Sequence, residues 1–415
     1  MNQILRWFTK KETLFVRLII FLTGLWCFLI PFGKGEQAPA ALLAIMGLSA
    51  LIRTRGVCAQ TSAAKGFLLL LTLYLIPIAI SLIDAVSFSA PFVVLMTGIG
   101  SGLAGLAIIH AIESDRRVLQ QITLVLACVV GFWFLDAGIQ AIFGRDIFGL
   151  AWEQRLSGPW MKKMQMGCYS GPFSALLLIF AMQKRWKPIL LWILFLFVSI
   201  IVLLNNSRGG WVMYAVVAPV FGWRAFIAKL RHRSLISAGL IAAGIVMIIG
   251  LYFSSSTFKA RADQSLIALQ GDKQAFNEAS SERLPIWVAA CRIIQAHPIN
   301  GVGARNFRKV APDYWPTDIE TVLTNATYPH QYVLEYAVGT GLVGILGFIV
   351  SAFFCVRWWR QANAKQRQDA FGFGLTLLAL YFPLNTHKAY FSSELAVSLW
   401  ILIALYVAAM RHQKT

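Results

Sequence analysis

The sequence predicts an all-α polytopic membrane protein of about twelve transmembrane helices, with one large helical loop outside the cytoplasm. Apolar residues make up 58% of the 415 residues and charged residues only 13%, whereas a soluble domain carries about 25% charge. The apolar residues also gather in runs of roughly 20, the length that crosses a bilayer. This composition excludes a soluble globular protein.

The apolar runs follow one another along most of the chain. The first comes after Arg6, Lys10 and Lys11, as in a signal peptide, but it is too long for the apolar core of one and no small-residue cleavage site follows. We therefore expect an uncleaved first span. The second and sixth runs are short, and the full series is 14–32, 37–52, 66–84, 90–112, 118–143, 167–183, 188–204, 209–228, 235–253, 331–356, 369–388 and 392–410.

Lysine and arginine outnumber the acidic residues by 37 to 18, which gives a formal net charge of +19. In a soluble protein this excess would suggest nucleic acid as a partner. Here it follows the rule that basic residues collect in cytoplasmic connections. With the N-terminus inside, each inner connection carries two to four Lys or Arg, and the short outer connections carry at most one. We therefore expect both termini in the cytoplasm and no nucleic-acid partner.

Two outer segments break this rule. One is the long segment 254–330, and the other is the connection 144–166, whose basic residues are Arg145, Arg155, Lys162 and Lys163. An anionic partner outside the cytoplasm would explain these charges. The shorter segment could instead lie on the anionic headgroups of membrane lipids.

The long outer segment has the pattern of folded structure. Residues 285–296 begin with a proline and place Ile286, Ala290, Ile293 and Ile294 on one face, which predicts an amphipathic helix on the membrane or on the spans. The stretch His297–Gly303 then ends this helix in a turn rich in proline and glycine. We expect His330 in the first turn of the next span. The predicted parts are helices 1–9 in residues 1–253, a large loop in 254–330 and helices 10–12 in 331–415.

Four short motifs in residues 205–350 together resemble the O-antigen ligase and polymerase superfamily of bacterial membrane glycosyltransferases. Their order, their spacing and the single long outer loop all match that superfamily. The motifs are Ser207-Arg208-Gly209, then Arg283 ahead of His297-Pro298 and Gly301 to Phe307, then His330-Gln331, and finally Gly339 to Gly344.

The resemblance implies an O-antigen ligase, a GT-C-like transferase of the bacterial inner membrane. Such an enzyme moves O-antigen from undecaprenyl diphosphate to the lipid A core oligosaccharide on the periplasmic face. Polymerisation of O-antigen units and transfer to a protein serine or threonine stay open, because nothing in the residue chemistry selects the acceptor. A lipid-linked sugar transporter fits less well, since Arg17 and Asp136 are the main ionisable residues deep within the runs.

The motif residues suit the chemistry of this transfer. Guanidinium groups bind phosphate oxygens in pairs, so we expect Arg208 and Arg283 to hold the donor's diphosphate, with Arg305 and the basic residues of 144–166 as secondary contacts. A neutral histidine is a suitable base for a sugar hydroxyl, and we assign His330 to that role in a single displacement with inversion. The alternatives are that Arg208 is an interface anchor and that Arg283 pairs with Glu282 or Glu278.

The sequence indicates no metal site and no cofactor. Its six cysteines lack zinc-binding spacing, and its outer acidic residues form no tight cluster suited to a divalent cation. We therefore expect a metal-independent reaction. His387 and Lys388 remain weak candidates for the acceptor side of the site.

Overall fold

The computed structural model describes residues 2–153, 155–161, 165–227, 233–316, 326–383 and 388–411. Within these ranges the chain forms sixteen α-helices, and its β structure is the isolated bridge between Arg145 and Ala151. The prediction of an all-α protein is confirmed.

Each apolar run of the sequence coincides with a helix. Six of these helices are long and apolar enough to cross a membrane, namely α3 (Ser62–Ile80), α4 (Ser89–Ser114), α5 (Arg117–Phe143), α6 (Met166–Gln183), α14 (Tyr332–Gln361) and α16 (Ser393–Arg411). The remaining runs form shorter apolar helices or helices interrupted by polar residues. These are α1 (Asn2–Leu29), α2 (Gln37–Arg53), α7 (Pro188–Leu204), α8 (Arg208–Gly222), α9 (Arg233–Ser254) and α15 (Ala364–Leu380). The chain is a polytopic membrane protein.

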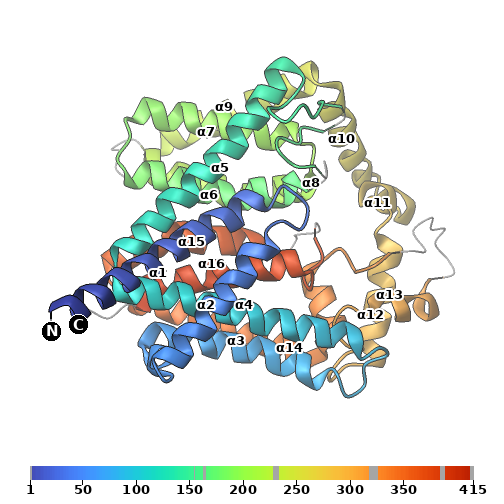
Figure 1. Cartoon of the computed structure of the whole chain (residues 1–415). Coiled ribbons are helices and arrows are strands. Elements are labelled where there is room, and N and C mark those ends of the chain that lie inside the picture. The colour runs from blue at the N-terminus through green and yellow to red at the C-terminus, as the bar shows by residue number, and fades with distance from the viewer. Residues whose placement is uncertain are drawn as a thin grey trace.

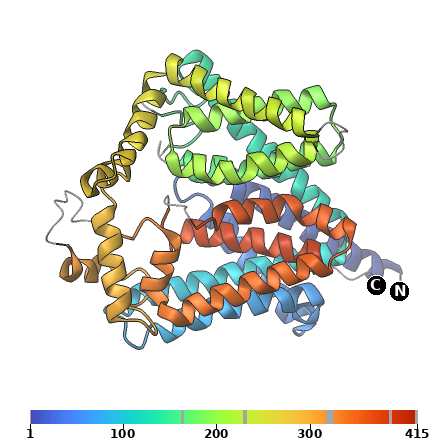
Figure 2. The same ribbon diagram turned by 180° about the vertical axis from the view of Figure 1, so that it is seen from behind.

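The bundle helices lie roughly along one direction, and the helices of the long loop lie across one end of the bundle (Figures 1 and 2). That loop consists of α10 (Ser256–Leu266), α11 (Lys273–Ala279), α12 (Leu284–Ala296) and the short α13 (Phe307–Val310). The N- and C-terminal ends of the chain lie together at the opposite end of the bundle. In the bundle, α4 packs on α2 and α16, while α6 packs on α8 and α15.

The amphipathic helix of the loop is α12, as predicted, and it rests on the bundle. Ile286, Ala290 and Ile293 are fully buried in a small core that also contains Val302 of the following turn and Val338 of α14. Ile294, the fourth residue of the predicted stripe, packs at the edge of this core. Burial of these side chains fixes α12 against the N-terminal part of α14.

Helix α14 is broken at Gly341, where φ is +60° and ψ is −156°. The turn after α12 fills the break, because Leu342 N donates to the carbonyl of Pro298 at 2.8 Å and Val343 N donates to that of Ile299 at 3.1 Å. A Cβ at position 341 would lie 2.3 Å from the Ile299 oxygen. Only glycine allows this approach with a positive φ.

The same turn is itself shaped by two glycines. Gly301 and Gly303 have φ values of +66° and +91°, and Val302 N donates to the carbonyl of Val338 at 2.9 Å. The interpretation of residues 297–303 as a structural turn is confirmed. Its function in the fold is to lock the long loop onto α14.

Candidate active site

Arg208 is the first residue of α8, and the sequence before it fixes where that helix begins. The Ser207 hydroxyl accepts from Gly210 N at 3.2 Å, which caps the helix. Glycines let α8 cross α6 closely, since a Cβ at Gly210 would lie 2.8 Å from the carbonyl oxygen of Gly167. This tight crossing sets the position from which the Arg208 side chain projects.

The Arg208 guanidinium binds the long loop. It donates to the carbonyl of Ala279 and to the hydroxyl of Ser281, both at the end of α11, and lies 3.5 Å from the hydroxyl of Ser265 on α10. All three acceptors are neutral, so the positive charge of Arg208 is not cancelled by them. The side chain is half-buried and is directed into the loop, unlike a simple interface anchor.

Arg283 occupies the cap position of α12, where Pro285 follows in the first turn. Its guanidinium is half-buried, and burial lowers its pKa, an effect that the nearby Tyr328 hydroxyl opposes. In the described ranges the ion pairs are Arg116–Asp369, Lys365–Asp369 and Lys388–Glu394, so none involves Arg283. The alternative of a salt bridge with Glu282 or Glu278 is not supported there.

Two further arginines join this group. Arg155 is half-buried, and its pKa is lowered by burial and then by the positive charges of Arg261 and Arg283. Arg208 lies within electrostatic range of the same two residues and of Arg155. Arg155, Arg208, Arg261 and Arg283 therefore form one group of guanidinium charges, named here the arginine cluster.

The segment that carries Arg155 is held firmly by the bundle. Gln140 of α5 accepts from the backbone N of Ser157 at 2.8 Å and of Gly158 at 2.9 Å, and Asn205 donates to the carbonyl of Leu156. These contacts explain how a loop residue reaches the arginine cluster. The sequence analysis identified Arg155 by its charge. It did not single out Arg261 as a site residue, although Arg261 is a basic residue of the long segment 254–330.

His330 lies just before α14, which corrects the prediction that it occupies the first turn. The helix starts at Tyr332, and Gln331 is its cap because its side chain accepts from Leu334 N. His330 adopts a left-handed backbone with φ of +54°, which cannot continue a helix. Its ring packs on Tyr328 with centroids 4.0 Å apart, and Trp287 donates to the carbonyl of Pro329 at 3.0 Å.

The electrostatic environment of His330 keeps its imidazole neutral. Burial and then the positive charge of Arg283 lower its pKa to about 4. Its Nδ1 is buried and forms no hydrogen bond to the residues described by the structure. A neutral ring with an unpartnered nitrogen can accept a proton from a ligand.

Left-handed backbone conformations are concentrated around these residues. Of the seven non-glycine residues with positive φ in the described ranges, Asn206, Ser281, Glu282 and His330 lie in or directly beside the motifs of Arg208, Arg283 and His330. Such conformations cost about 1–3 kcal/mol and gather at functional sites. They indicate that the surrounding fold holds these motifs in place.

The remaining predicted contacts are exposed or lie outside the described residues. Arg145 is exposed at the start of its loop. Arg305 is exposed and lies within electrostatic range of the buried Glu335 of α14. Lys162, Lys163 and His387 fall outside the described residues.

A separate polar group surrounds Lys388, the other weak acceptor-side candidate. Lys388 forms a buried ion pair with Glu394 of α16, and its ammonium group donates to the Tyr169 hydroxyl at 3.3 Å. Glu335 accepts from the backbone N of Tyr390 at 2.8 Å and so holds the chain that leads from Lys388 into α16. These contacts hold the described residues from Lys388 onward against α6, α14 and α16.

No group of three or more His, Cys, Asp and Glu side chains suited to hold a metal ion occurs in the ranges that the structure describes. The charges of the arginine cluster, at the N-terminal ends of α8 and α12, come from guanidinium groups. Such a set of donors fits an anionic ligand, above all one that carries phosphate.

Comparison with known proteins identifies the segment that contains these residues. Residues 192–349 match the family model described as O-antigen ligase (Wzy_C), and no curated protein matches the chain in sequence. The matched segment runs from within α7 to within α14 and includes Arg208, Arg283 and His330. Over residues 192–349 the chain is thus similar to the O-antigen ligase family, as its motifs indicated.

Proposed function

We propose that this protein is an O-antigen ligase of the bacterial inner membrane. It would transfer O-antigen polysaccharide from undecaprenyl diphosphate to the lipid A core oligosaccharide at the periplasmic face. The observation that carries the proposal is the arginine cluster, whose charges meet no carboxylate partner in the described residues, beside the neutral His330.

The arginine cluster suits the donor's diphosphate. Arg208 and Arg283 each offer a planar guanidinium that can bind two phosphate oxygens at once. Arg155 and Arg261 add positive charge to the same region. When the sugar–phosphate bond breaks, these groups stabilise the negative charge that develops on the leaving diphosphate. In this proposal the reaction needs no metal ion, because the arginines supply the charge.

His330 acts as the base for the acceptor. The acceptor hydroxyl attacks the anomeric carbon, its proton passes to His330, and the bonding electrons leave with the diphosphate. This single displacement inverts the configuration at the anomeric carbon. Binding of the anionic donor offsets the charge of Arg283 and so raises the pKa of His330. The base therefore becomes stronger only when the donor is present.

The proposed topology has twelve membrane crossings with both termini in the cytoplasm. It is supported by the coincidence of the apolar runs with twelve helices and by the common location of the chain ends opposite the long loop. In this arrangement α10 to α13 lie in the periplasm. The candidate site then faces the compartment where both lipid substrates present their sugars.

The test is a transfer assay with purified protein in detergent and excess EDTA. Undecaprenyl-diphosphate-linked O-antigen is supplied with lipid A core, with a second lipid-linked O-unit, or with a serine- and threonine-containing peptide. We expect transfer to lipid A core. Transfer to the O-unit instead would identify a polymerase, and transfer to the peptide a protein glycosyltransferase. Absence of any transfer, with folded protein and intact lipids, would remove the transferase proposal in favour of a transporter.

A further inference from the structure

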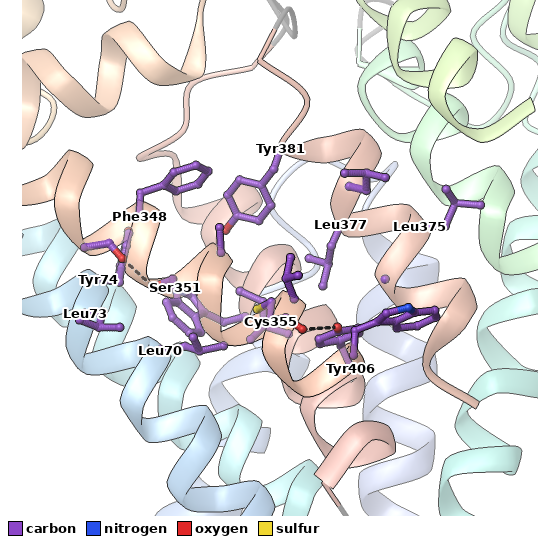
Figure 3. Close-up of a pocket in the computed structure, with 18 of the residues that line it drawn as sticks. Leu70, Leu73, Tyr74, Phe348, Ser351, Cys355, Leu375, Leu377, Tyr381 and Tyr406 are labelled. Carbon is purple, nitrogen blue, oxygen red and sulfur yellow. Dashed lines mark hydrogen bonds between the residues drawn. The ribbon is translucent and has the colours of Figure 1, made fainter. Parts of the chain in front are cut away.

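A cavity of about 420 Å³ lies inside the bundle between α14, α15, α16 and α3 (Figure 3). Its volume falls within the range of about 300–1,000 Å³ that is usual for ligand sites. The cavity is elongated, because its lining on α14 includes both Gly347 and Trp359. Twelve residues of helix correspond to about 18 Å. This shape fits a chain better than a compact ligand.

The lining of this cavity is mostly apolar, although Tyr74, Tyr336, Tyr381 and Tyr390 also belong to it. None of the lining residues that the structure describes is charged. The Ser351 hydroxyl donates to the carbonyl of Gly347 at 2.8 Å, and the Tyr406 hydroxyl donates to that of Cys355 at 3.1 Å, so both are satisfied within the protein. A ligand whose buried part is mainly hydrocarbon therefore fits this cavity best, since an unpaired polar group is costly in apolar surroundings.

The cavity opens between α14 and α15 toward the outside of the bundle. Helices α14 and α15 follow one another in the chain, yet α14 packs on α3 and α12 while α15 packs on α16 and α6. Val356 and Leu378 line the cavity and are still 51% and 56% exposed. A hydrocarbon chain in the membrane can enter between these two helices.

The helices around the cavity also carry the candidate site. Val220 of α8 belongs to its lining and lies about 18 Å along the helix from Arg208. Tyr336 of α14 lines it as well and follows His330 by six residues in the chain. A lipid whose diphosphate binds the arginine cluster would thus have its chain directed along these helices toward the cavity.

We propose that this cavity holds part of the polyprenyl tail of the donor lipid. The inference rests on the proposed function for the diphosphate end of that lipid. Nine of the 22 lining residues are aromatic, and Figure 3 shows the rings of Phe348 and Tyr381 side by side at one end. Such rings form broad and rigid walls, which suit the planar, methyl-branched isoprene unit. Binding of the tail there would select polyprenyl donors and would position the diphosphate at the arginine cluster.

The test is photolabelling of the purified full-length protein with undecaprenyl diphosphate that carries a diazirine near the free end of its chain. The probe contains no sugar and the assay no acceptor, so labelling is independent of transfer. Labelled peptides are mapped by mass spectrometry. We expect label on α14 and α15 between residues 347 and 381, with competition by unlabelled undecaprenyl diphosphate and none by phospholipid.

Two matched variants make the test specific. Ser351→Phe fills the cavity and should reduce the labelling of these helices at least tenfold. Ile349→Phe adds the same ring to a position on α14 that is 56% exposed and lies outside the lining, and it should leave labelling unchanged. If Ser351→Phe fails to fold, Ala352→Phe, which also lines the cavity, replaces it.

Either of two results would overturn the tail site. One is labelling confined to other helices and unaffected by Ser351→Phe. The other is labelling of the cavity by a phospholipid with a diazirine in its acyl chain that undecaprenyl diphosphate fails to displace. Labelled cavity helices without any transfer activity would contradict the proposed function alone.

Discussion

The side chains of His330 and Arg283 influence each other through charge, and their proximity sets the pH range of the site. Burial and the Arg283 charge lower the pKa of His330 to about 4, well below its ordinary value of about 6.5. The motifs identified both residues from sequence. Their mutual effect was not predictable, because Arg283 and His330 are brought together only when α12 packs on α14.

The first prediction concerns the pH profile of kcat/KM. The neutral form of His330 is the active form, so kcat/KM should stay constant from pH 7 down to about pH 5 and fall below about pH 4. In Arg283→Gln, whose activity is lower, the fall should begin at a higher pH than in the wild type, because the Arg283 charge is removed while burial, the larger cause of the lowered pKa, remains. Transfer assays across pH 3.5–8 measure this profile. Enzyme returned from each low pH to pH 7 is assayed again, to check that it has not been inactivated. A wild-type limb near pH 6.5 would contradict the pKa assignment.

The second prediction concerns the geometry of the arginines. Arg208→Lys and Arg283→Lys keep the charge and lose the paired donors, so each should lower transfer by about 10-fold or more, because a hydrogen bond to a charged group contributes about 1.5–3 kcal/mol. Arg308→Lys, at an exposed position of α13, is the control and should behave as wild type. Initial rates at subsaturating donor measure the effect. Equal rates for all three variants would show that charge alone suffices.

At the scale of elements, the contact between the turn 297–303 and the broken helix α14 joins the long loop to the bundle. The sequence predicted the helices themselves, since apolar runs and the stripe on α12 can be read locally. It did not predict the break in α14. The motif Gly339–Gly344 reads as a helix with several glycines, and the break depends on the carbonyls of Pro298 and Ile299, about 40 residues earlier in the chain.

The third prediction tests this contact. Gly341→Ala places a Cβ against the Ile299 carbonyl at a positive φ, so it should destabilise the protein by about 2–5 kcal/mol. The thermal unfolding midpoint of the purified protein measures the loss. Gly100→Ala is the matched control, because a Cβ there meets no atom within 4 Å and alanine favours a helix. An unchanged midpoint for Gly341→Ala would contradict the locking of the loop onto α14.

At the scale of the whole molecule, the charges of the candidate site lie at one end of the bundle and the chain termini at the other. This asymmetry fits an enzyme that works on one face of a membrane. The sequence anticipated it through the basic residues of two outer segments. It did not show that Arg155 and Arg261 join Arg208, because the relative positions of three separate segments depend on tertiary packing.

The fourth prediction uses a natural cysteine to test the topology. Cys291 is exposed on α12, so a membrane-impermeant maleimide should label it from the periplasmic side of intact spheroplasts. Cys291→Ser should lose this label. In that background Arg185→Cys, at the exposed turn between α6 and α7, should react only after the membrane is opened. The reverse pattern would place the arginine cluster on the cytoplasmic side.

The measurement that tests the central claim most directly compares donor binding with single-turnover transfer in His330→Gln. The variant keeps the size and polarity of the side chain but cannot take a proton at neutral pH. The account predicts donor binding within about threefold of wild type and a transfer rate lower by about 10²–10⁴-fold. His297→Gln, at the end of α12, should behave as wild type. Transfer by His330→Gln at the wild-type rate would contradict the assignment of His330 as the base.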